Sequence, residues 1–204
     1  VNRGGEVELD LIDSASGEVR LLRGGLGVHS RPCWSPGEDF ITFEHESPLS
    51  PPNLYRLNLD GGEAMALTHT IPPALEALPL VKPEIITHKS SDGLEIPAFL
   101  FRPPHPNGAA IVDPHGGPSA QYMFDWDIFP QYLVAKGYTF LTPNYRGSTG
   151  YGRPYERLNY NAWGIGDTQD CLYAARYLRA LPGIDPARLA ITGGSYGGYM
   201  TICC

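Results

Sequence analysis

The chain has 204 residues, and 42% of them are hydrophobic, so it can bury the cores of one or two domains. Its 24 glycines and 20 prolines stay below the share that marks disordered or collagen-like chains. The apolar runs are short and interrupted, and none approaches the roughly 18 to 20 residues that span a bilayer. We therefore expect a folded, soluble protein that has no membrane segment.

The formal net charge of −7 lies entirely in the first part of the chain. Residues 1–81 contain 5 basic and 12 acidic residues, whereas residues 82–204 contain 10 of each. This difference indicates two modules of different composition. Because the chain has no basic cluster to neutralise phosphates, we do not expect nucleic acid as a partner.

The four cysteines show neither the spacing of a zinc site nor that of a disulfide framework, and the adjacent pair Cys203 and Cys204 is a poor disulfide candidate. We therefore expect no metal, no other cofactor, and a reducing, cytoplasmic compartment. The chain begins at Val1 rather than Met and ends without a helix cap. We expect both ends to be cut from a longer protein.

The first part of the chain, from Glu6 to about Leu67, has the period-two alternation of short strands. Turn signals at Ser16-Gly17, at 35–38 and at 60–62 predict antiparallel hairpins between them. The expected strands are 7–11, 19–22, 40–43, 54–59 and 64–67. This meander resembles one blade of a β-propeller, and a piece of an ordinary β-sandwich is the alternative.

A proline-rich segment, 72–83, predicts a linker, and the pattern changes after it. Residues 85–88 and 96–101 predict a hairpin. The short apolar runs 109–112, 138–141 and 189–192 are typical of buried parallel strands, with helices expected at 129–136 and 167–181. Strands that alternate with helices predict an α/β sheet.

The motif Gly193-Gly194-Ser195-Tyr196-Gly197-Gly198 follows an expected strand and precedes an expected helix. This is the context of a nucleophile elbow, a sharp strained turn that lifts a serine hydroxyl off the sheet. Gly193 and Gly197 are needed because side chains there would collide with the neighbouring strand and helix. Ser195 is therefore the candidate catalytic nucleophile, and a glycine-rich turn with a solvated serine is the alternative.

A second motif, His115-Gly116-Gly117-Pro118, follows the expected strand at 109–112. A glycine pair at a strand end lets bare backbone approach a substrate carbonyl. The N–H groups of Gly117 and Tyr196 are therefore the candidate oxyanion hole. For His115, a hydrogen bond that fixes the loop is the preferred interpretation over a role as catalytic base.

Four motifs together resemble the prolyl oligopeptidase family of serine peptidases (family S9), in its acylaminoacyl-peptidase and dipeptidyl-aminopeptidase-like branch. They are residues 115–118, residues 144–152, Trp163-Gly164 with Asp167 and Asp170, and residues 193–200. The resemblance covers nearly the whole chain. It implies the last propeller blade at 1–71, the linker at 72–83, and the front half of an α/β-hydrolase domain at 84–204.

The resemblance also implies roles for individual residues. Ser195 would be the nucleophile, Gly117 and Tyr196 the oxyanion hole, and the Tyr196 ring a wall of the pocket for the residue before the scissile bond.

Arg146 would contact substrate or the propeller, although a salt bridge that holds its loop is the favoured alternative. Tyr151, Tyr155 and Tyr160 suit either a pocket wall or an interface core. Asp167 and Asp170 suit the first turn of a helix, where carboxylates favour the dipole, and are not interpreted as an acid/base pair.

The catalytic triad of this fold runs in the order serine, acid, histidine. Only nine residues follow Ser195, and all six histidines precede it, so we expect the triad acid and histidine beyond residue 204. Without a base, the serine hydroxyl is a weak nucleophile, and we expect this fragment to be inactive. The strand at 189–192 would be an open apolar edge that favours a homo-oligomer.

Three functions remain open at this point. The first is a serine peptidase that cleaves short peptides through an acyl-enzyme. The second is a carboxylesterase or lipase on the same fold, which the elbow by itself does not exclude. The third is a non-catalytic module in which the acidic first part binds a partner.

Overall fold

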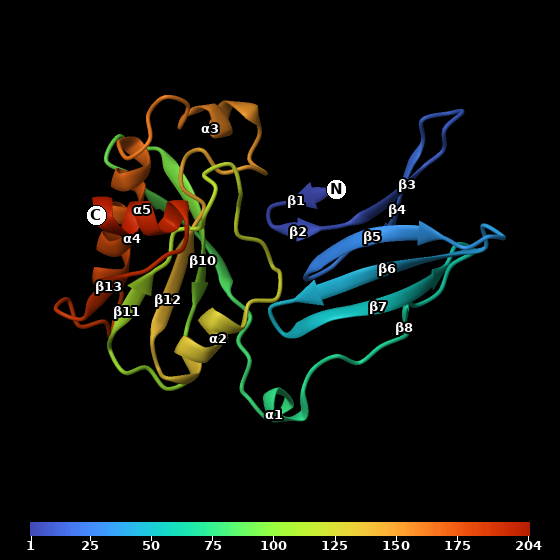
Figure 1. Cartoon of the computed structure of the whole chain (residues 1–204), viewed down its shortest axis with the longest axis horizontal. Coiled ribbons are helices and arrows are strands. Elements are labelled where there is room, and N and C mark those ends of the chain that lie inside the picture. Colours follow the sequence, from blue (N-terminus) through green and yellow to red (C-terminus); the bar gives the residue numbers. More distant parts are fainter. The chain divides into compact units, whose positions relative to one another are not determined.

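The computed structural model describes residues 1–204, which form two compact units (Figure 1). The first unit comprises Val1–Leu78 and Met123–Asp127, and the second comprises Pro79–Tyr122 and Ile128–Cys204. The segment Met123–Asp127 therefore joins the first unit although it lies between two strands of the second, an excursion that we did not expect from the sequence. None of the helices has both the length and the apolar character needed to cross a bilayer.

The first unit is built on a six-stranded sheet in the order β1-β2-β5-β6-β7-β8. These strands are β1 (Asn2–Arg3), β2 (Glu6–Val7), β5 (Val28–Trp34), β6 (Phe40–Ser47), β7 (Ser50–Asn58) and β8 (Met65–Ala66). Strands β5 to β8 form an antiparallel meander, whereas β2 pairs with β5 in parallel through Val7 and Val28. The sequence analysis did not predict β5.

A separate hairpin joins β3 (Leu9–Ile12) to β4 (Val19–Arg23). Its turn is fixed by Asp13, whose carboxylate accepts hydrogen bonds from the amides of Ala15 and Ser16 at 3.0 and 2.7 Å. The core of the first unit lies against β6 and consists of Leu9, Ile41, Phe43 and Leu57. Burying such side chains contributes about 1.5 to 3 kcal/mol each.

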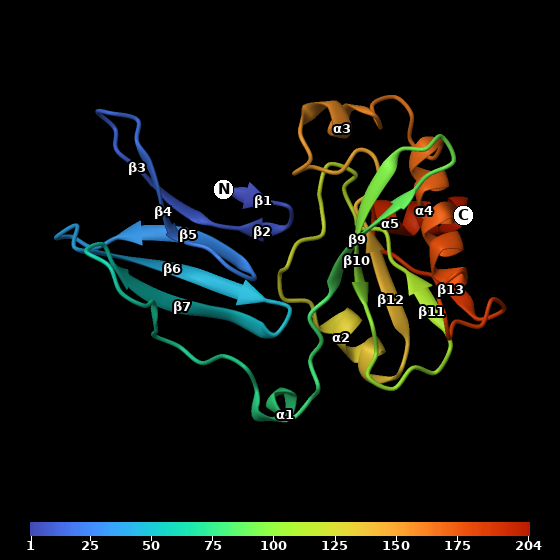
Figure 2. The same ribbon diagram turned by 180° about the vertical axis from the view of Figure 1, so that it is seen from behind.

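The second unit has a five-stranded mixed sheet in the order β13-β11-β12-β10-β9. Its strands are β9 (Glu84–Lys89), β10 (Glu95–Phe101), β11 (Ala110–Val112), β12 (Thr139–Pro143) and β13 (Leu189–Ile191). The last three run parallel, and Figure 2 shows the antiparallel β9–β10 hairpin beside β12. The expected hairpin and the three expected parallel strands are present, with ends shifted by one or two residues.

Five helices accompany the sheets: α1 (Pro73–Glu76), α2 (Ile128–Ala135), α3 (Arg153–Arg157), α4 (Gly166–Arg179) and α5 (Tyr196–Cys203). Helix α4 packs against β9, β11 and β12 and buries Ala174 and Leu178 against Leu100 and Leu141 of the sheet. This is the apolar face expected from the spacing of residues 171–178. The short helices α1 and α3 were not expected, because their proline-containing sequences lack a helical periodicity.

Candidate active site

Ser195 lies between the end of β13 and the start of α5, where the sequence predicted a nucleophile elbow. Its backbone has φ +53° and ψ −122°, a region that residues with a Cβ rarely occupy. Such a conformation costs on the order of 1 to 3 kcal/mol and persists only where the surroundings impose it. The serine is therefore held in a strained turn by its environment.

The surrounding glycines explain how the turn is held. A Cβ on Gly193 would lie 2.6 Å from the backbone carbon and oxygen of Gly197, and a Cβ on Gly197 would overlap the carbonyl oxygen of Pro114. At Gly194, by contrast, a Cβ would meet nothing within 4 Å. The close approach of strand ends and helix thus requires glycine at 193 and 197, and not at 194.

The glycine pair after β11 lies directly beside the serine. A Cβ on Gly116 would be 3.3 Å from the Cβ of Ser195 and 3.8 Å from its hydroxyl oxygen. Gly117 has φ +131°, and a Cβ there would come within 2.8 Å of the amide nitrogen of Ser119. Tyr196 is the first residue of α5, so its amide has no partner within the helix. The fold therefore gathers the nucleophile candidate, the glycine loop and a free helix N-terminus in one place.

His115 is buried and fixed in this loop. Its Nδ1 lies 2.6 Å from the carbonyl oxygen of Gly116, its Nε2 lies 2.8 Å from the hydroxyl of Ser148, and its ring stacks on Tyr145. The Ser148 hydroxyl donates to the carbonyl oxygen of Tyr145 at 2.6 Å, so Ser148 also ties this contact to the segment just after β12. Burial lowers the pKa of His115 to about 4. Both nitrogens are occupied, so His115 holds the loop and is not directed at Ser195.

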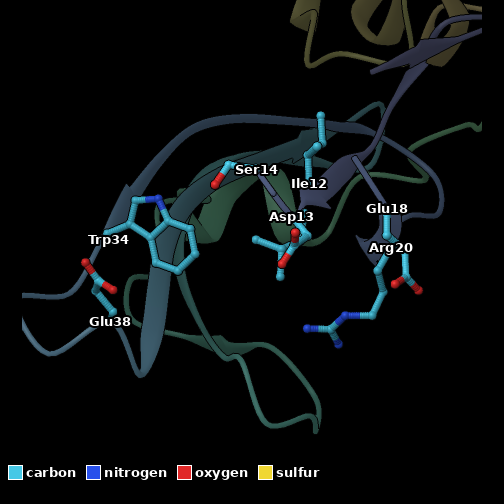
Figure 3. A pocket seen from close by; sticks show the side chains of 8 residues that line it. Ile12, Asp13, Ser14, Glu18, Arg20, Trp34 and Glu38 are labelled. Atoms are coloured by element: carbon cyan, nitrogen blue, oxygen red, sulfur yellow. The ribbon is translucent and has the colours of Figure 1, made fainter. Parts of the chain in front are cut away.

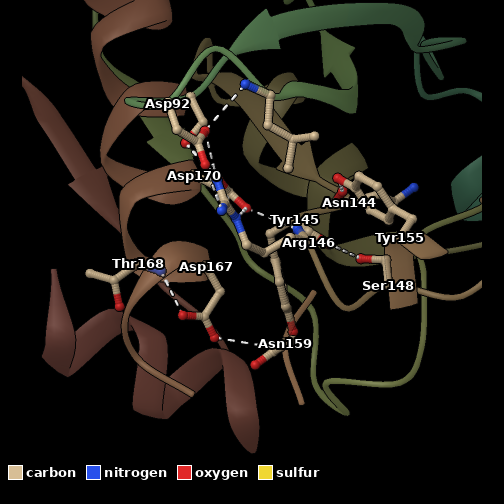
Figure 4. A network of polar contacts seen from close by, with 12 residues as sticks. Asp92, Asn144, Tyr145, Arg146, Ser148, Tyr155, Asn159, Asp167, Thr168 and Asp170 are labelled. Carbon is tan, nitrogen blue, oxygen red and sulfur yellow. Dashed lines mark hydrogen bonds and ion pairs between the residues drawn. The ribbon is translucent and has the colours of Figure 1, made fainter. Parts of the chain in front are cut away.

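The side chain of Tyr196 points to a buried carboxylate. Its hydroxyl donates to Asp167. Asp167 also accepts from the amide of Thr168 at 2.9 Å and from the side chain of Asn159 at 3.3 Å (Figure 4). Burial and the hydrogen bond to Asp167 raise the pKa of the Tyr196 hydroxyl. Since only 8% of Tyr196 is exposed, its ring is a largely covered support of the site.

The exposed aromatic surface next to Tyr196 belongs to the loop before α4. The Trp163 ring is 61% exposed and meets the Tyr196 ring edge-on at 5.5 Å. A hollow of about 540 Å³ is lined by Tyr160, Asn161 and Trp163. The sequence analysis listed Tyr160 as a possible pocket wall but gave no such role to Trp163, since an isolated tryptophan in a loop does not reveal which ring it will contact.

Arg146 forms the centre of an ion-pair network that is buried at Asp170 and exposed at Asp92 (Figure 4). Its guanidinium lies 2.8 Å from Asp170 of α4 and 2.9 Å from Asp92 in the β9–β10 turn, and Asp170 also accepts from Ser90 at 2.6 Å. The hydrogen bond from Arg146 lowers the pKa of Asp92 to about 2. Arg146 thus makes the salt bridge that the sequence analysis favoured, and its contact with substrate stays a prediction.

Tyr151 and Tyr155 are both engaged with Asn144. Tyr155 donates to the backbone oxygen of Asn144 at 2.7 Å, and the Asn144 side chain donates to the Tyr151 hydroxyl at 2.8 Å. These contacts order the loop that follows β12. Asp167 and Asp170 lie in the first turns of α4, as expected, and both are fully buried anchors of these networks.

Comparisons with known proteins were made for the sequence and for the fold. Residues 122–204 match the model of the prolyl oligopeptidase family. The chain is 34% identical over 172 residues to the uncharacterized peptidase YuxL of Bacillus subtilis, covering 82% of this chain and 26% of that protein. It is 28% identical over 207 residues to the acylamino-acid-releasing enzyme of Sus scrofa, covering 95% of this chain and 28% of that protein.

Solved structures give the same result for the fold. A puromycin-hydrolyzing peptidase of Mycobacterium tuberculosis matches 98% of this chain and 32% of its own, with a TM-score of 0.85 and 27% identity. The acylaminoacyl peptidase of Pyrococcus horikoshii matches 99% of this chain and 34% of its own, with a TM-score of 0.81 and 29% identity. The chain thus spans between a quarter and about a third of these proteins. By motif, sequence similarity and fold, the chain belongs to the prolyl oligopeptidase family.

Proposed function

We propose that this chain supplies the nucleophile and the oxyanion hole of a serine peptidase that hydrolyses short peptides through an acyl-enzyme on Ser195. The observation that carries the proposal is the strained backbone of Ser195 at the N-terminus of α5, with the 116–117 glycine loop beside its hydroxyl. Peptidases with acylaminoacyl, dipeptidyl and puromycin-hydrolysing names among the relatives support the reaction class.

In this mechanism the hydroxyl oxygen of Ser195 attacks the scissile carbonyl carbon, and the carbonyl oxygen becomes an oxyanion. The N–H groups of Gly117 and Tyr196 donate to that oxygen, and each such donor contributes about 10² to 10³ in rate. The leaving amine departs with a proton, and water then releases the acyl group from Ser195. The Tyr196 hydroxyl is committed to Asp167, so the backbone and not the side chain of Tyr196 faces the reaction.

The serine proton requires a base, and we propose that this base is none of the six histidines of the chain. His115 precedes Gly116, which lies beside Ser195, and its two ring nitrogens contact the Gly116 carbonyl oxygen and the Ser148 hydroxyl. The triad acid and histidine would therefore be supplied by residues after 204 in a longer protein. We expect the chain by itself to have no measurable peptidase turnover.

We further propose that the first unit corresponds to the last blade of a propeller, with residues 1–71 as blade, 72–83 as linker and 84–204 as the front half of an α/β-hydrolase domain. The antiparallel meander of β5 to β8 has the strand number of one blade. The mixed sheet with α4 and α5 suits the hydrolase assignment.

A fluorophosphonate probe tests the nucleophile in the longer protein that contains this sequence. We expect labelling of the unchanged protein, loss of labelling in Ser195→Ala, and unchanged labelling in the control Ser14→Ala, which removes an exposed hydroxyl of the first unit. Labelling that persists in Ser195→Ala would show that another residue is the nucleophile. A carboxylesterase on the same fold is separated by substrate: turnover of acyl esters without turnover of aminoacyl amides would reject the peptidase.

A hollow in the first unit favours a second candidate function, the binding of a cationic partner. It measures about 530 Å³, and the indole of Trp34 lies there with three acidic side chains and one basic side chain, which are Asp13, Glu18, Glu38 and Arg20 (Figure 3). A lysine or arginine side chain would gain both ion pairing and a cation–π contact there. The test is a titration of the chain with a lysine-rich peptide, followed by tryptophan fluorescence, and with a glutamate-rich peptide as control. Equal responses to both peptides would reject this function.

A further inference from the structure

The side chain of Tyr196 is the one that can hold the nucleophile elbow in place. Residues 193–198 consist of four glycines, Ser195 and Tyr196. Glycines have no side chain to anchor, and the Ser195 hydroxyl has to stay free to react. Tyr196, by contrast, is buried, with 8% of the residue exposed. Any side-chain contact that fixes this turn is therefore made by Tyr196.

The hydroxyl of Tyr196 is anchored on α4. It donates a hydrogen bond to Oδ2 of Asp167, a fully buried residue in the first turn of that helix. The carboxylate is itself fixed by two further donors: the amide of Thr168 donates to Oδ1 at 2.9 Å, and the side chain of Asn159 donates to Oδ2 at 3.3 Å (Figure 4). A Cβ on Gly147 would lie 2.4 Å from the Cβ of Asn159, so Asn159 is also closely packed. Asp167 is thus a fixed point for the Tyr196 side chain.

The ring of Tyr196 is held between its two ends by a neighbouring aromatic ring. It stacks on the ring of Tyr145, with the centroids 6.1 Å apart and the planes at 28°. Tyr145 is fully buried, and its hydroxyl donates to the backbone oxygen of His115 at 2.8 Å, directly before the 116–117 glycine loop. The same aromatic pair therefore connects the elbow with the loop that carries the other proposed oxyanion donor.

The direction of the Tyr196 N–H depends on this anchored side chain. Ser195 has φ +53° and ψ −122°, and such a strained conformation persists only where the surroundings impose it. The ψ angle of Ser195 sets the peptide plane that carries the Tyr196 N–H, so a shift of Tyr196 turns that N–H. A catalytic group misplaced by about 1 Å can lose about 10²-fold in rate.

We propose that Asp167 is a positioning residue, which holds the Tyr196 side chain so that the Tyr196 N–H is directed at the oxyanion. The inference rests on the proposed function, since it assigns Asp167 to the oxyanion hole of that same reaction. Asp167 acts through the Tyr196 hydroxyl and does not itself touch the reacting atoms. Its loss should therefore slow the chemical step and leave substrate binding largely as it is.

Two conservative variants break this contact from its two sides. Tyr196→Phe removes the hydroxyl and keeps the ring. Asp167→Asn keeps the shape of the side chain, but it offers one oxygen to three donors that use two, so at least one donor faces an NH₂ group. In the longer protein that contains this sequence, each variant should lower kcat for a peptide substrate about 10- to 100-fold. KM should change by less than about twofold.

A double-mutant cycle separates positioning from general damage to the fold. If Asp167 acts through the Tyr196 hydroxyl, the double variant should have the kcat of the slower single variant, because the contact is already broken. The control Tyr155→Phe removes a tyrosine hydroxyl that donates to the backbone oxygen of Asn144 instead, and its effect should multiply with that of Asp167→Asn. Losses that also multiply for Asp167→Asn and Tyr196→Phe, or a raised KM at unchanged kcat, would overturn the proposal.

Two further measurements distinguish a failure of this inference from a failure of the proposed function. Turnover that persists in Ser195→Ala rejects the proposed function, whereas turnover that depends on Ser195 but has an unchanged kcat in Asp167→Asn rejects the inference alone. The amide signals of residues 195–197 in the ¹⁵N NMR spectrum of the chain need no turnover. Asp167→Asn should shift them and Tyr155→Phe should leave them in place. If Asp167→Asn folds and these signals do not move, Asp167 does not position the elbow.

Discussion

The buried imidazole of His115 makes a definite prediction about stability and pH. Its pKa is about 4 in the folded chain, against an ordinary value of 6.5, because burial disfavours the charged ring. Between these two values the unfolded chain binds a proton that the folded chain does not. Stability from this group is therefore fully present above pH 6.5 and is lost as the pH falls toward 4.

The size of the effect follows from the two pKa values. A difference of 2.5 pKa units corresponds to about 3 kcal/mol over the whole window, of which about 2 kcal/mol is lost by pH 5. The assay is urea unfolding at pH 7.5, 6.5, 5.5 and 5.0, followed by circular dichroism. The comparison is between the unchanged chain and His115→Gln, which keeps a polar side chain at this position but cannot titrate.

Other groups titrate in the same range, so the difference between variants is the quantity that decides. Burial also lowers the pKa values of His29 and His88, and burial raises that of Asp125 to about 6. These groups contribute equally to both proteins and cancel. At pH 7.5 we expect His115→Gln to have a lower free energy of unfolding than the unchanged chain, and most of this difference should disappear by pH 5.0. The exposed control His105→Gln should follow the unchanged chain. A difference in the free energy of unfolding between His115→Gln and the unchanged chain that stays the same at every pH would refute the reasoning.

Two further predictions concern packing and charge in the second unit, and both are measured by urea unfolding at pH 7.5. Gly197→Ala should lower the free energy of unfolding by about 3 kcal/mol or more, because its Cβ would overlap a backbone carbonyl. Gly194→Ala is the control and should lower it by under about 1 kcal/mol, because a Cβ there meets open space. Equal losses in the two variants would contradict the crowding at residue 197. Asp170→Asn should lower the free energy of unfolding by about 3 to 5 kcal/mol, because it leaves the largely buried guanidinium of Arg146 without its buried partner. Asp92→Asn, at the exposed end of the same network, should lower it by about 1 kcal/mol or less. The reverse order would contradict the assignment of the buried pair.

Much of the site could be predicted because it depends on local chemistry. The elbow was predictable from Gly193 and Gly197, since only glycine tolerates the approach of strand end and helix that the turn needs. The parallel strands and α4 were predictable from the period of their apolar residues. These signals are contained in windows of a few residues, so no knowledge of distant contacts is needed to interpret them.

The rest depends on contacts between distant segments, which a local pattern does not contain. The segment Met123–Asp127 joins the first unit through hydrogen bonds such as Phe124 to Gly5 and Trp126 to Glu46. The buried cluster of Tyr145, Cys171, Tyr196 and Met200 forms only because α4 and α5 pack together. Likewise, the choice between substrate contact and ion pairing for Arg146 depended on where Asp92 and Asp170 would lie.

The backbone of the elbow separates the nucleophile from the alternative of an ordinary glycine-rich turn. Four glycines surround Ser195, yet the residue with φ in the left-handed region is the serine, at +53°, and none of Gly193, Gly194, Gly197 or Gly198 has a positive φ. A turn that served only to reverse the chain would place a glycine there, because glycine adopts this conformation without a steric penalty. Strain on the one residue that carries a hydroxyl is expected where the hydroxyl must be held in a fixed position.

This argument predicts the stability of two variants at the same position. Ser195→Gly removes the Cβ and with it the strain, so it should be more stable than Ser195→Ala, which keeps both. The relief of about 1 to 3 kcal/mol is partly offset by the greater freedom of glycine in the unfolded chain, leaving a net gain of about 1 kcal/mol in urea unfolding. If Ser195→Gly is instead the less stable of the two, the turn is not strained at Ser195, and the distinction from an ordinary turn no longer holds. If it is more stable, the chain gives up stability in order to present a serine at this position, as expected of a site selected for function.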